Sequence, residues 1–322
     1  MNRFGYACIN MALREKGIFN SRTMRKATFL SKGLPYASQL VLQNIKDLLP
    51  IFNWNHKNNV EVFRISSTIA PWASEYELHE LPDYEEICHY LKMAGDYTKV
   101  IGQRVSFHPG QFNCLASEKD YVVQNCIKDL EIHGKLFDLM GLDQNHWSKI
   151  NIHLGSTCGG NLQLAADNFN KNFQRLSPSV QSRLTVENDD KASMFSSKFL
   201  YENVYKVTGV PIVFDSHHFS LGPQDAPYDE SFDMAYESWP STIRPTCHHS
   251  NGKKEYEDST ARSAAAHSDF YYKPFDSCGK SVDVMLEAKK KEKALAAKTA
   301  KLAAEAKESS RDVFNSILLL LS

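Results

Sequence analysis

The sequence contains no apolar run long enough to cross a membrane, which would take about 18 to 20 consecutive apolar residues. The apolar run near its end, Ile317–Leu321, is much shorter than that. The N-terminus has no basic segment followed by an apolar stretch, so we do not expect a secretory signal. Together these features predict a protein that neither spans a membrane nor is exported.

Closely paired cysteines are also missing. The seven cysteines are scattered, odd in number and never spaced as Cys-x-x-Cys. This pattern fits neither a disulfide framework nor a structural zinc site, and it is typical of packed, reduced thiols. We therefore expect an intracellular protein in a reducing compartment, either the nucleus or the cytoplasm.

The chain has no excess of charge of one sign, because 37 Lys and Arg face 38 Asp and Glu. Nucleic-acid binding would therefore need a local basic patch or bound metal ions. Residues 11–36 form such a patch, which we call the basic arm. Its charged residues are Arg14, Lys16, Arg22, Arg25, Lys26 and Lys32 against the single Glu15. We expect phosphate contacts from Arg22, Arg25 and Lys26, with a plain solvated loop as the alternative.

Short runs rich in β-forming residues alternate with helix-length segments eight times along the chain. The expected strands are Arg3–Cys8, Val60–Ser66, Arg104–His108, Lys149–His153, Leu184–Glu187, Pro211–Asp215, Ile243–His248 and Val282–Glu287. Such alternation favours a parallel sheet, and eight repeats favour a closed barrel. We therefore predict an α/β fold with a single (β/α)₈ TIM-type barrel; an open doubly wound sheet is the alternative.

The segments between the strands have helical patterns. They are Ser38–Asn55, Asp83–Ile101, Tyr121–Met140, Asn161–Leu176, Ser197–Thr208 and Asp229–Ser238, and we expect Asp83 and Asn161 to cap their helices. The connection Asn251–Ser281 is polar and long, which is typical of a functional loop. Residues Ala288–Arg311 read as one solvated terminal helix. We accordingly divide the chain into a barrel domain, 1–290, and a helical tail rich in Lys and Ala, 291–322.

Polar side chains stand at the ends of seven of the eight expected strands. They are Tyr6, His108, His153, Glu187, Asp215 with His217 and His218, His248 with His249, and Glu287. In a barrel the C-terminal ends of the strands meet on one face, where the active sites of this fold lie. A single buried histidine is most often structural. Several strands that deliver imidazoles and carboxylates to one place indicate a metal site, because burying such groups is costly unless they are paired or bound.

The chemistry of these groups limits which metals they would hold. Imidazole and carboxylate ligands without thiolates suit Zn²⁺, Mn²⁺ or Fe²⁺, and not a closed structural zinc site. Three carboxylates and about five histidines are more than one ion needs, so we expect two or three ions that share a bridging carboxylate. Such an arrangement activates a water and stabilises the leaving oxygen in phosphoryl chemistry.

Eight short motifs resemble successive motifs of the UV damage endonuclease family. They are Arg3-Phe-Gly-Tyr-Ala-Cys8, Phe63-Arg-Ile-Ser-Ser67, Phe107-His-Pro-Gly-Gln111, Ile152-His-Leu-Gly155, Val186-Glu-Asn-Asp189, Val213-Phe-Asp-Ser-His-His218, Thr246-Cys-His-His-Ser250 and Asp283-Val-Met-Leu-Glu-Ala-Lys289. The resemblance implies a barrel related to that of endonuclease IV with a manganese-type metal cluster. It also implies incision of double-stranded DNA on the 5′ side of cyclobutane dimers, of 6–4 photoproducts and of other lesions such as abasic sites.

Carried over by motif, the resemblance implies a set of metal ligands. They are His108, His153, Glu187, Asp215, His218, His248, His267 and Glu287. Among them Glu187, His153 and His248 are the expected catalytic residues. Two to three divalent ions are expected, Mn²⁺ first, with Mg²⁺, Zn²⁺ or Co²⁺ as alternatives. The strand period also favours His248 over His249, whereas the choice of His218 over His217 rests on the motif alone.

The chain departs from the family pattern at three positions. Thr68 replaces a histidine of some members, Thr246 a lysine, and Phe112 the tyrosine that often follows His-Pro-Gly-Gln. These replacements leave the number of ions and the fine geometry open, while the expected reaction class stays the same.

Lesion recognition is expected from Gln111 and Phe112, in the segment just after His108. An amide followed by a flat apolar ring suits insertion between base steps, and packing on the barrel rim is the alternative. Tyr6 is expected either to stack on the lesion or to hydrogen-bond within the barrel. Asn10 and Arg64 are further expected DNA contacts.

Two other functions compete with a repair endonuclease. A sugar isomerase or epimerase uses a similar barrel with divalent metals, but it needs neither the basic arm nor an inserting pair such as Gln111 and Phe112. The other is a catalytically inactive DNA-binding barrel, which the nearly complete ligand set disfavours. We expect a monomer without an obligate protein partner.

Overall fold

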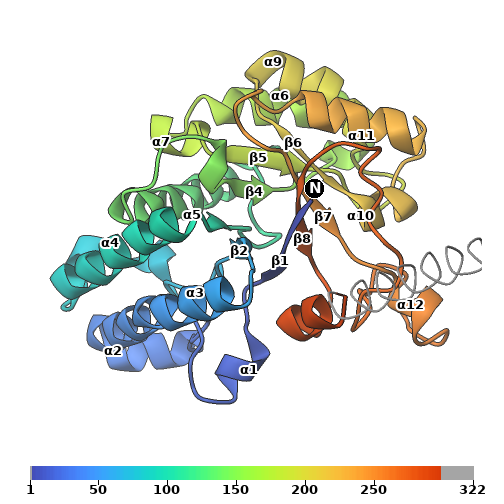
Figure 1. Ribbon diagram of the computed structural model, residues 1–322. Helices are drawn as coiled ribbons and strands as arrows, with labels where there is room; N and C mark the ends of the chain where they lie inside the picture. Colours follow the sequence, from blue (N-terminus) through green and yellow to red (C-terminus); the bar gives the residue numbers. More distant parts are fainter. Residues whose placement is uncertain (1, 299–322) are drawn as a thin grey trace, which may run out of the picture.

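A computed structural model describes residues 2–298 of the chain and shows a barrel of eight parallel strands (Figure 1). The strands are β1 Arg3–Ala7, β2 Val62–Arg64, β3 Arg104–Ser106, β4 Ile150–Ile152, β5 Leu184–Glu187, β6 Ile212–Asp215, β7 Thr246–His249 and β8 Asp283–Leu286. Their order is β3-β2-β1-β8-β7-β6-β5-β4, and a parallel bridge between Phe107 and Ile150 joins the two ends. The predicted barrel is therefore confirmed over the open sheet.

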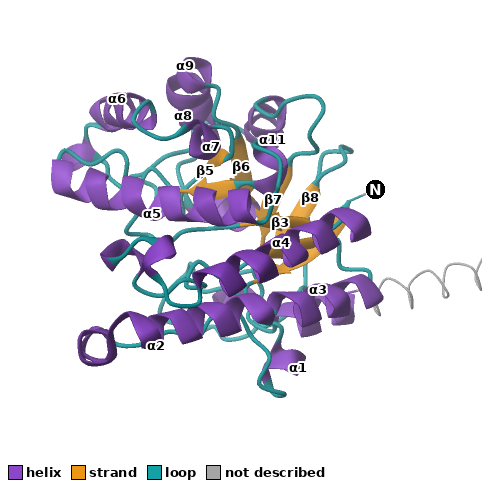
Figure 2. Cartoon of the chain, turned by 90° about the vertical axis from the view of Figure 1, so that its left-hand side faces the viewer, coloured by secondary structure: helices purple, strands orange, loops and turns teal. Residues whose placement is uncertain are grey.

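Helices surround the barrel on its outside (Figures 1 and 2). The α-helices are α1 Met11–Arg14, α2 Lys26–Lys46, α3 Leu48–Lys57, α4 Tyr84–Ile101, α5 Asp120–Leu139, α6 Leu162–Phe173, α7 Pro178–Gln181, α8 Ser197–Leu200, α9 Lys206–Thr208, α10 Ser216–Leu221, α11 Tyr228–Glu237 and α12 Lys253–Tyr256. A π-helical turn, Tyr201–Tyr205, joins α8 to α9, and short 3₁₀ turns lie at Ala73–Glu75, Leu78–Glu80, His146–Ser148 and Cys158–Gly160.

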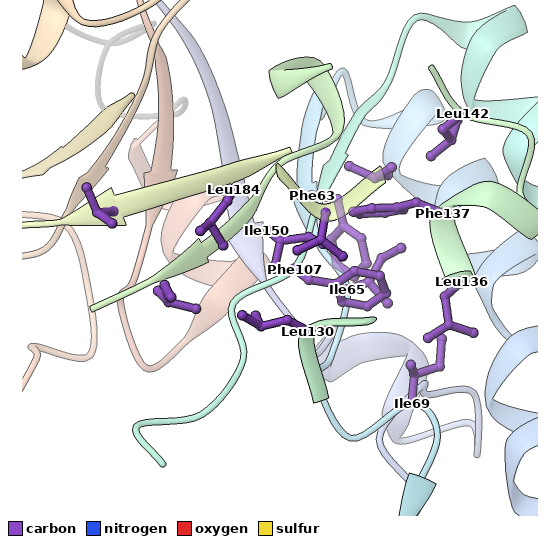
Figure 3. Close-up of a cluster of buried hydrophobic side chains, with 14 of the residues drawn as sticks. Phe63, Ile65, Ile69, Phe107, Leu130, Leu136, Phe137, Leu142, Ile150 and Leu184 are labelled. Carbon is purple, nitrogen blue, oxygen red and sulfur yellow. The ribbon is translucent and has the colours of Figure 1, made fainter. Parts of the chain in front are cut away.

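The apolar core lies between the outer face of the barrel and the helices, and Figure 3 shows part of it. Phe107 follows β3 and packs against Phe137 and His133 of α5, with ring centroids 4.6 and 4.8 Å apart. Ile150 and Leu184 are register partners in β4 and β5 and belong to the same cluster. Because side chains alternate along a strand, apolar residues that face outward leave the positions between them pointing into the barrel. Those inward positions carry the polar residues described below.

Ion pairs close the N-terminal end of the barrel. The carboxylate of Asp283 in β8 accepts hydrogen bonds from Arg3 and Arg104, whose side-chain nitrogens lie 2.6 and 2.9 Å from Oδ2. Asp283 and Arg104 are almost completely buried. Removing one partner of such a buried pair usually costs about 3–5 kcal/mol of stability. This end of the barrel thus contributes to stability, opposite the face where the site lies.

The helix expected at Ser38–Asn55 is wrong in its bounds, because the chain forms two helices that meet at Asp47. Pro50 explains the break, since it has no N–H for the carbonyl of residue 46 and its ring collides with that carbonyl. The first of the two helices, α2, begins at Lys26 and is kinked at Gly33, where φ is 63°. Part of the basic arm is therefore helical and not a plain loop.

The two expected helix caps differ in outcome. The side chain of Asn161 accepts from the backbone N–H of Leu164 and caps α6, as predicted. Asp83 stands at the cap position of α4 but makes no capping hydrogen bond. Its carboxylate instead accepts the hydroxyl of Ser38 in α2, at 2.7 Å, so the predicted cap position is confirmed but the side chain does not form the capping bond. The side chain ties two helices together and leaves the end of α4 uncapped.

The expected terminal helix begins at residue 291, and its described part runs to residue 298. Glu292, Ala294 and Leu295 in this part are buried. The Glu292 carboxylate accepts the backbone N–H groups of Met11 and Ala12, both at 2.9 Å, at the start of α1. Residues 299–322, and with them most of the predicted tail, lie outside the described residues; the division at residue 290 stays a prediction.

Two expectations from composition can be compared with residues 2–298. No helix in this range has the length and apolarity needed to cross a membrane. All seven cysteines lie in the same range, and the structure shows each of them as a free thiol. The compartment in which the protein works stays a prediction.

Candidate metal centre

Imidazoles and carboxylates from the C-terminal ends of six strands, joined by one from α10 and one from the connection 251–281, meet at one end of the barrel. His108 and His153 follow β3 and β4, Glu187 ends β5 and Asp215 ends β6. The remaining members are His218 in α10, His248 in β7, His267 in the connection 251–281 and Glu287 directly after β8. The expected convergence of strand ends thus brings the predicted ligand residues together on one face.

Glu187 lies at the centre of this cluster and is 1% exposed. Its Oε2 atom is 3.2 Å from His108 Nε2, 3.0 Å from His248 Nδ1 and 4.0 Å from His153 Nε2. Its Oε1 atom faces the other way and is 3.2 Å from His218 Nδ1. The two oxygens of one carboxylate therefore face different imidazoles, Oε1 facing His218 and Oε2 facing the other three.

Two further carboxylates flank Glu187. Asp215 caps α10, because its Oδ1 accepts the backbone N–H groups of His217 and His218 at 2.7 and 2.8 Å. Glu287 is ion-paired with Arg64 of β2. Its Oε1 lies 3.5 Å from His248 Nδ1, and its Oε2 lies 3.7 Å from His267 Nε2. Both carboxylates are thus fixed by protein donors before any ligand is considered.

The electrostatics of the cluster divide its histidines into two kinds. Burial lowers the pKa of His108 to about 4, and Glu187 only partly offsets this effect. At His153 and His218, burial is outweighed by the neighbouring carboxylates, which raise the pKa to about 9 and about 11. His248 first, then His153, His108 and His218, hold the pKa of Glu187 well below its usual range despite its burial. At neutral pH, protons on His153 and His218 therefore balance negative charge that cations could balance instead.

The buried polar atoms of the cluster fit bound cations. Glu187 Oε1, Asp215 Oδ2 and His248 Nδ1 are buried and make no hydrogen bond. Such atoms are costly in a protein interior unless something else satisfies them. Three groups of side chains bring one possible ligand atom each to within 4.8 Å of one another, and they are His108–Glu187–His248, His153–Glu187–His218 and Asp215–His248–Glu287. Nitrogen and oxygen donors in these numbers suit Mn²⁺, Fe²⁺ or Zn²⁺.

Polar contacts at Nδ1 orient two of the imidazoles. His218 Nδ1 lies 3.0 Å from the carbonyl oxygen of Asn188, and His153 Nδ1 lies 3.0 Å from Asp189 Oδ1. At His153, Nε2 is the atom that faces Glu187, so a proton on Nδ1 would leave the Nε2 lone pair free for a cation, as at many metal-binding histidines. Asp189 lies in the Val186-Glu-Asn-Asp189 motif but was not singled out by the sequence. Its position two residues after Glu187 was the available signal.

The long connection 251–281 delivers His267 to the cluster. Gly252 and His267 form an antiparallel bridge, and the Ser250 hydroxyl is 2.5 Å from His267 Nδ1. Glu257 holds the following turn by accepting the backbone N–H groups of Asp269 and Phe270. The connection is mostly irregular, as expected, but these bonds give it a defined shape beside the site.

The two neighbouring histidines that the sequence left open lie outside the central group. His249 is bonded to the Ser216 hydroxyl at 2.6 Å and to the Lys273 carbonyl at 3.0 Å. The ring of His217 packs against that of His267, with centroids 5.4 Å apart. The structure therefore brings His248 and His218 to Glu187.

Sequence reasoning missed a layer of polar side chains inside the barrel, below the cluster. Lys149 directly before β4, Asn151 of β4 and Thr185 of β5 are buried and point inward. Lys149 Nζ lies 3.5 Å from His248 Nε2, and burial lowers its pKa to about 7. The signal was present in the sequence: Lys149, Asn151 and His153 are polar at every second position of a strand that is otherwise apolar. Thr246 of β7 is also buried, and its hydroxyl makes no hydrogen bond.

The pair Gln111 and Phe112 stands free on the rim of the same face. Phe112 is 85% exposed, so it does not pack on the barrel rim. The backbone N–H of Asn113 donates to the Gly110 carbonyl at 3.0 Å and closes the turn that carries the pair. The Asn113 side chain donates to Asp129 of α5 at 2.7 Å and anchors this turn. The ring is thus presented to solvent on a fixed support.

Two expected lesion contacts, Tyr6 and Asn10, are internal in this structure. Tyr6 is completely buried, and its hydroxyl donates to Asn55 Oδ1 at 2.6 Å. Asn10 caps α1 through Leu13 and donates to the Tyr6 hydroxyl. Both side chains form their hydrogen bonds within the protein. Of the two expectations for Tyr6, the structure therefore has the hydrogen bond within the barrel and not an exposed ring that could stack on a lesion.

The basic residues differ in how free they are. Arg22 is tied down, because it pairs with Asp47 at 2.7 Å and donates to the carbonyls of Phe19 and Gly17. Its expected role as a free phosphate contact is therefore corrected to a structural one. Arg25 and Lys26, at the start of α2, are exposed. Arg64 is mostly buried and faces Glu287, not open solvent.

Comparison with known proteins agrees with the geometry. The family described as UV-endonuclease UvdE matches residues 2–314. The chain is 34% identical over 307 residues to the UV-damage endonuclease of Schizosaccharomyces pombe, covering 91% of this chain and 49% of that protein, so it spans about half of that relative's length. It is 31% identical over 302 residues to the UV DNA damage endonuclease of Bacillus cereus strain G9842, covering 91% of this chain and 92% of that one.

Among solved structures, the crystal structure of SacUVDE superimposes with a TM-score of 0.80 at 28% sequence identity. The match covers 95% of this chain and 99% of that chain, so the whole barrel is shared. The family assignment favours the endonuclease prediction over the sugar isomerase alternative. This chain belongs to the UV-endonuclease UvdE family.

Proposed function

We propose that the protein is a metal-dependent DNA repair endonuclease that incises double-stranded DNA on the 5′ side of UV photoproducts. The observation that carries the proposal is the position of Glu187, a buried carboxylate whose two oxygens face different imidazoles. Family membership supplies the reaction class, and the resemblance of the motifs supplies the side of incision. Cyclobutane dimers and 6–4 photoproducts are the proposed substrates, with abasic sites as a further one.

The residues that would hold the ions are the eight predicted ligands. They are His108, His153, Glu187, Asp215, His218, His248, His267 and Glu287. Two or three divalent ions, Mn²⁺ first among them, would supply an activated water and stabilise the leaving oxygen of in-line hydrolysis. Glu187 would hold neighbouring cations together. His153 and His248, whose rings are held in place, would help to orient the scissile phosphate.

Lesion recognition is assigned to Gln111 and Phe112. A UV dimer stacks and pairs poorly, so extruding it costs less than extruding a normal base, and the gap in the duplex must then be filled. An exposed ring on an anchored turn beside the metal centre suits this task. Arg25 and Lys26 would contact the phosphates of the duplex and add affinity that does not depend on sequence. The protein is proposed to act as a monomer.

Nicking of a supercoiled plasmid tests this function. Purified protein with Mn²⁺ should convert a UV-irradiated plasmid to the open-circular form and leave an unirradiated plasmid intact. Equal nicking of both plasmids would contradict lesion recognition. Binding to the irradiated plasmid without nicking, at any concentration of Mn²⁺, would instead support the catalytically inactive alternative.

A further inference from the structure

We infer that Asn151 is a positioning residue, which holds the Glu187 carboxylate so that its two oxygens serve two different cations. The inference rests on the proposed metal-dependent function. It concerns a residue of the barrel interior that is neither among the eight predicted ligands nor in contact with solvent.

The strand register brings three polar side chains together. Asn151 of β4 and Thr185 of β5 are partners in the parallel ladder, and Glu187 lies two residues beyond Thr185 on the same inward face. Asn151 and Thr185 are completely buried, and Glu187 is 1% exposed. The Asn151 Nδ2 group donates a hydrogen bond to Glu187 Oε2. A bond from an amide to an ionised carboxylate in the interior is among the stronger ones in proteins.

Thr185 fixes which side of the Asn151 amide faces the carboxylate. The Thr185 hydroxyl lies 2.8 Å from Asn151 Oδ1 and donates to it. Because Oδ1 can only accept, the NH₂ side of the amide is the one that points to Glu187. The three residues thus form a chain of donors, Thr185 to Asn151 to Glu187, whose direction is set by chemistry.

This chain of bonds leaves the two carboxylate oxygens in different states. Oε2 has one lone pair engaged by Asn151 and faces His108 and His248, whereas Oε1 makes no hydrogen bond and faces His218. The terminal torsion of a glutamate is soft, so a carboxylate without this donor could rotate freely. With the donor in place, Oε2 points to His108 and His248 of one ligand group, and Oε1 is left for His218 of the other, His153–Glu187–His218.

A purely structural role for Asn151 makes a different prediction. If the amide only satisfied a buried carboxylate, its loss would lower stability and weaken every bound ion alike. A positioning role predicts that the first ion still binds, because one ion does not need a bridge. The second ion should bind more weakly, because the bridge is no longer held. The ratio of the two affinities therefore distinguishes the roles.

The test is a titration with Mn²⁺ in which free Mn²⁺ is followed by electron paramagnetic resonance. The variants are Asn151→Leu, which removes the donor, Thr185→Val, which removes the hydroxyl that orients it, and Thr185→Ser, which keeps that hydroxyl. Asn172→Leu is the matched control, because Asn172 is a buried asparagine that donates to the Leu115 carbonyl at 2.8 Å, away from the cluster. Thermal unfolding in EDTA checks that each variant is folded.

We expect Asn151→Leu to weaken the second Mn²⁺ by about tenfold to a hundredfold, the usual size of effects from residues behind metal ligands. The first Mn²⁺ should change by much less. Thr185→Val should show a smaller loss in the same direction, while Thr185→Ser and Asn172→Leu should bind as the parent does. If Asn151→Leu does not fold, Thr185→Val carries the test, since it leaves Asn151 and the volume of the interior in place.

Two results would overturn the inference and leave the proposed function standing. One is parent-like binding of both ions by the folded Asn151→Leu and Thr185→Val variants. The other is an equal weakening of both ions, which is the result expected of a structural role. A parent protein that binds no Mn²⁺ would overturn the proposed function itself, and this inference with it.

Discussion

At the scale of single residues, Glu187 and Asp215 share one property: the protein holds one oxygen of each carboxylate and leaves the other without a hydrogen bond. Asp215 Oδ1 is held by two backbone N–H groups and Glu187 Oε2 by Asn151, whereas Asp215 Oδ2 and Glu187 Oε1 are buried and unsatisfied. A carboxylate in this state is oriented before any cation arrives. This pre-orientation is what a multi-ion centre requires of its ligands.

Replacing Glu187 with Gln should therefore lower the cleavage rate by orders of magnitude. The amide keeps the size of the side chain but removes the charge that would hold neighbouring cations together. Binding to damaged DNA should be largely retained, because Glu187 is buried away from the rim. Single-turnover cleavage of a UV-damaged duplex, together with a binding assay, measures both effects. Near-normal turnover would show that the metal centre lies elsewhere.

Gln111 and Phe112 are predicted to act on recognition and not on metal binding. Contacts between a base and an aromatic ring are worth about 1–3 kcal/mol each, so changing both residues to Ala should weaken binding to a dimer-containing duplex about tenfold or more. The loss should be smaller where flanking mismatches already unpair the lesion. Metal content should stay constant. Val100→Ala is a control, because Val100 is 83% exposed at the far end of α4.

An unchanged affinity of the Gln111→Ala, Phe112→Ala variant for both duplexes would contradict the inserting role. Recognition would then have to come from another part of the face, such as the connection 251–281.

At the scale of elements, the start of α2 provides the free positive charge. Arg25→Ala with Lys26→Ala should weaken binding to damaged and undamaged duplex alike and reduce the slope of log K against log salt by about one to two, because each phosphate that the protein no longer neutralises lowers the slope by about one. Lys57 and Lys171 are exposed near the C-terminal ends of α3 and α6, and their replacement by Ala is the matched control. A salt slope equal to that of the parent would place α2 away from the DNA.

The positions of helices and strands could be predicted from the sequence wherever the hydrophobic pattern was that of a single helix or strand. The strand β5 has the predicted bounds, because a buried strand reads as a short apolar run that ends in Glu187. The region of α2 and α3 was predicted as one helix, since periodicity alone does not show where Pro50 interrupts the backbone hydrogen bonds. Asp83 stands at the predicted cap position, but its side chain has another partner for a related reason. Its partner Ser38 is distant in sequence, and only the packing of α2 on α4 brings the two together.

The residues of the candidate metal centre could be predicted from the sequence, but the side chains that hold them in place could not. Strand ends converge in any barrel, so the positions of Glu187 and His248 could be argued from the sequence. Tyr6 is hydrogen-bonded to Asn55, and Arg22 is ion-paired with Asp47. The sequence does not reveal these tertiary contacts, which hold both side chains within the protein and not at the expected DNA surface. Asn151 was overlooked because the role of an inward-facing asparagine cannot be inferred until the residues beside it on the neighbouring strand are known.

At the scale of the whole molecule, the net charge of −1 means that affinity for DNA would have to come from a local basic patch, such as the proposed basic arm, or from bound cations. The histidines of the proposed metal centre would make the binding of cations depend on pH. The carboxylates around His153 and His218 raise the pKa of these groups to about 9 and about 11. A protonated imidazole cannot bind an ion, so each ion must displace protons.

The affinity for Mn²⁺ should therefore rise with pH between pH 6 and 8, by up to about tenfold per pH unit for each proton displaced. The sign follows from the raised pKa, because the proton that competes with the ion is held across this whole range and becomes easier to remove as pH increases. Titration calorimetry in buffers of different ionisation enthalpy counts the protons released. An affinity that does not depend on pH would contradict this picture of the centre.

The central claim is that this barrel cuts DNA beside a UV lesion and needs divalent ions to do so. It is tested most directly on a duplex with one cyclobutane dimer at a known position and a label on the 5′ end of the damaged strand. With Mn²⁺ we expect a single labelled product that ends on the 5′ side of the dimer, no product after exhaustive removal of metal with EDTA, and full recovery when Mn²⁺ is added back. Cleavage by protein shown to be free of metal, or cuts placed without regard to the dimer, would contradict the account.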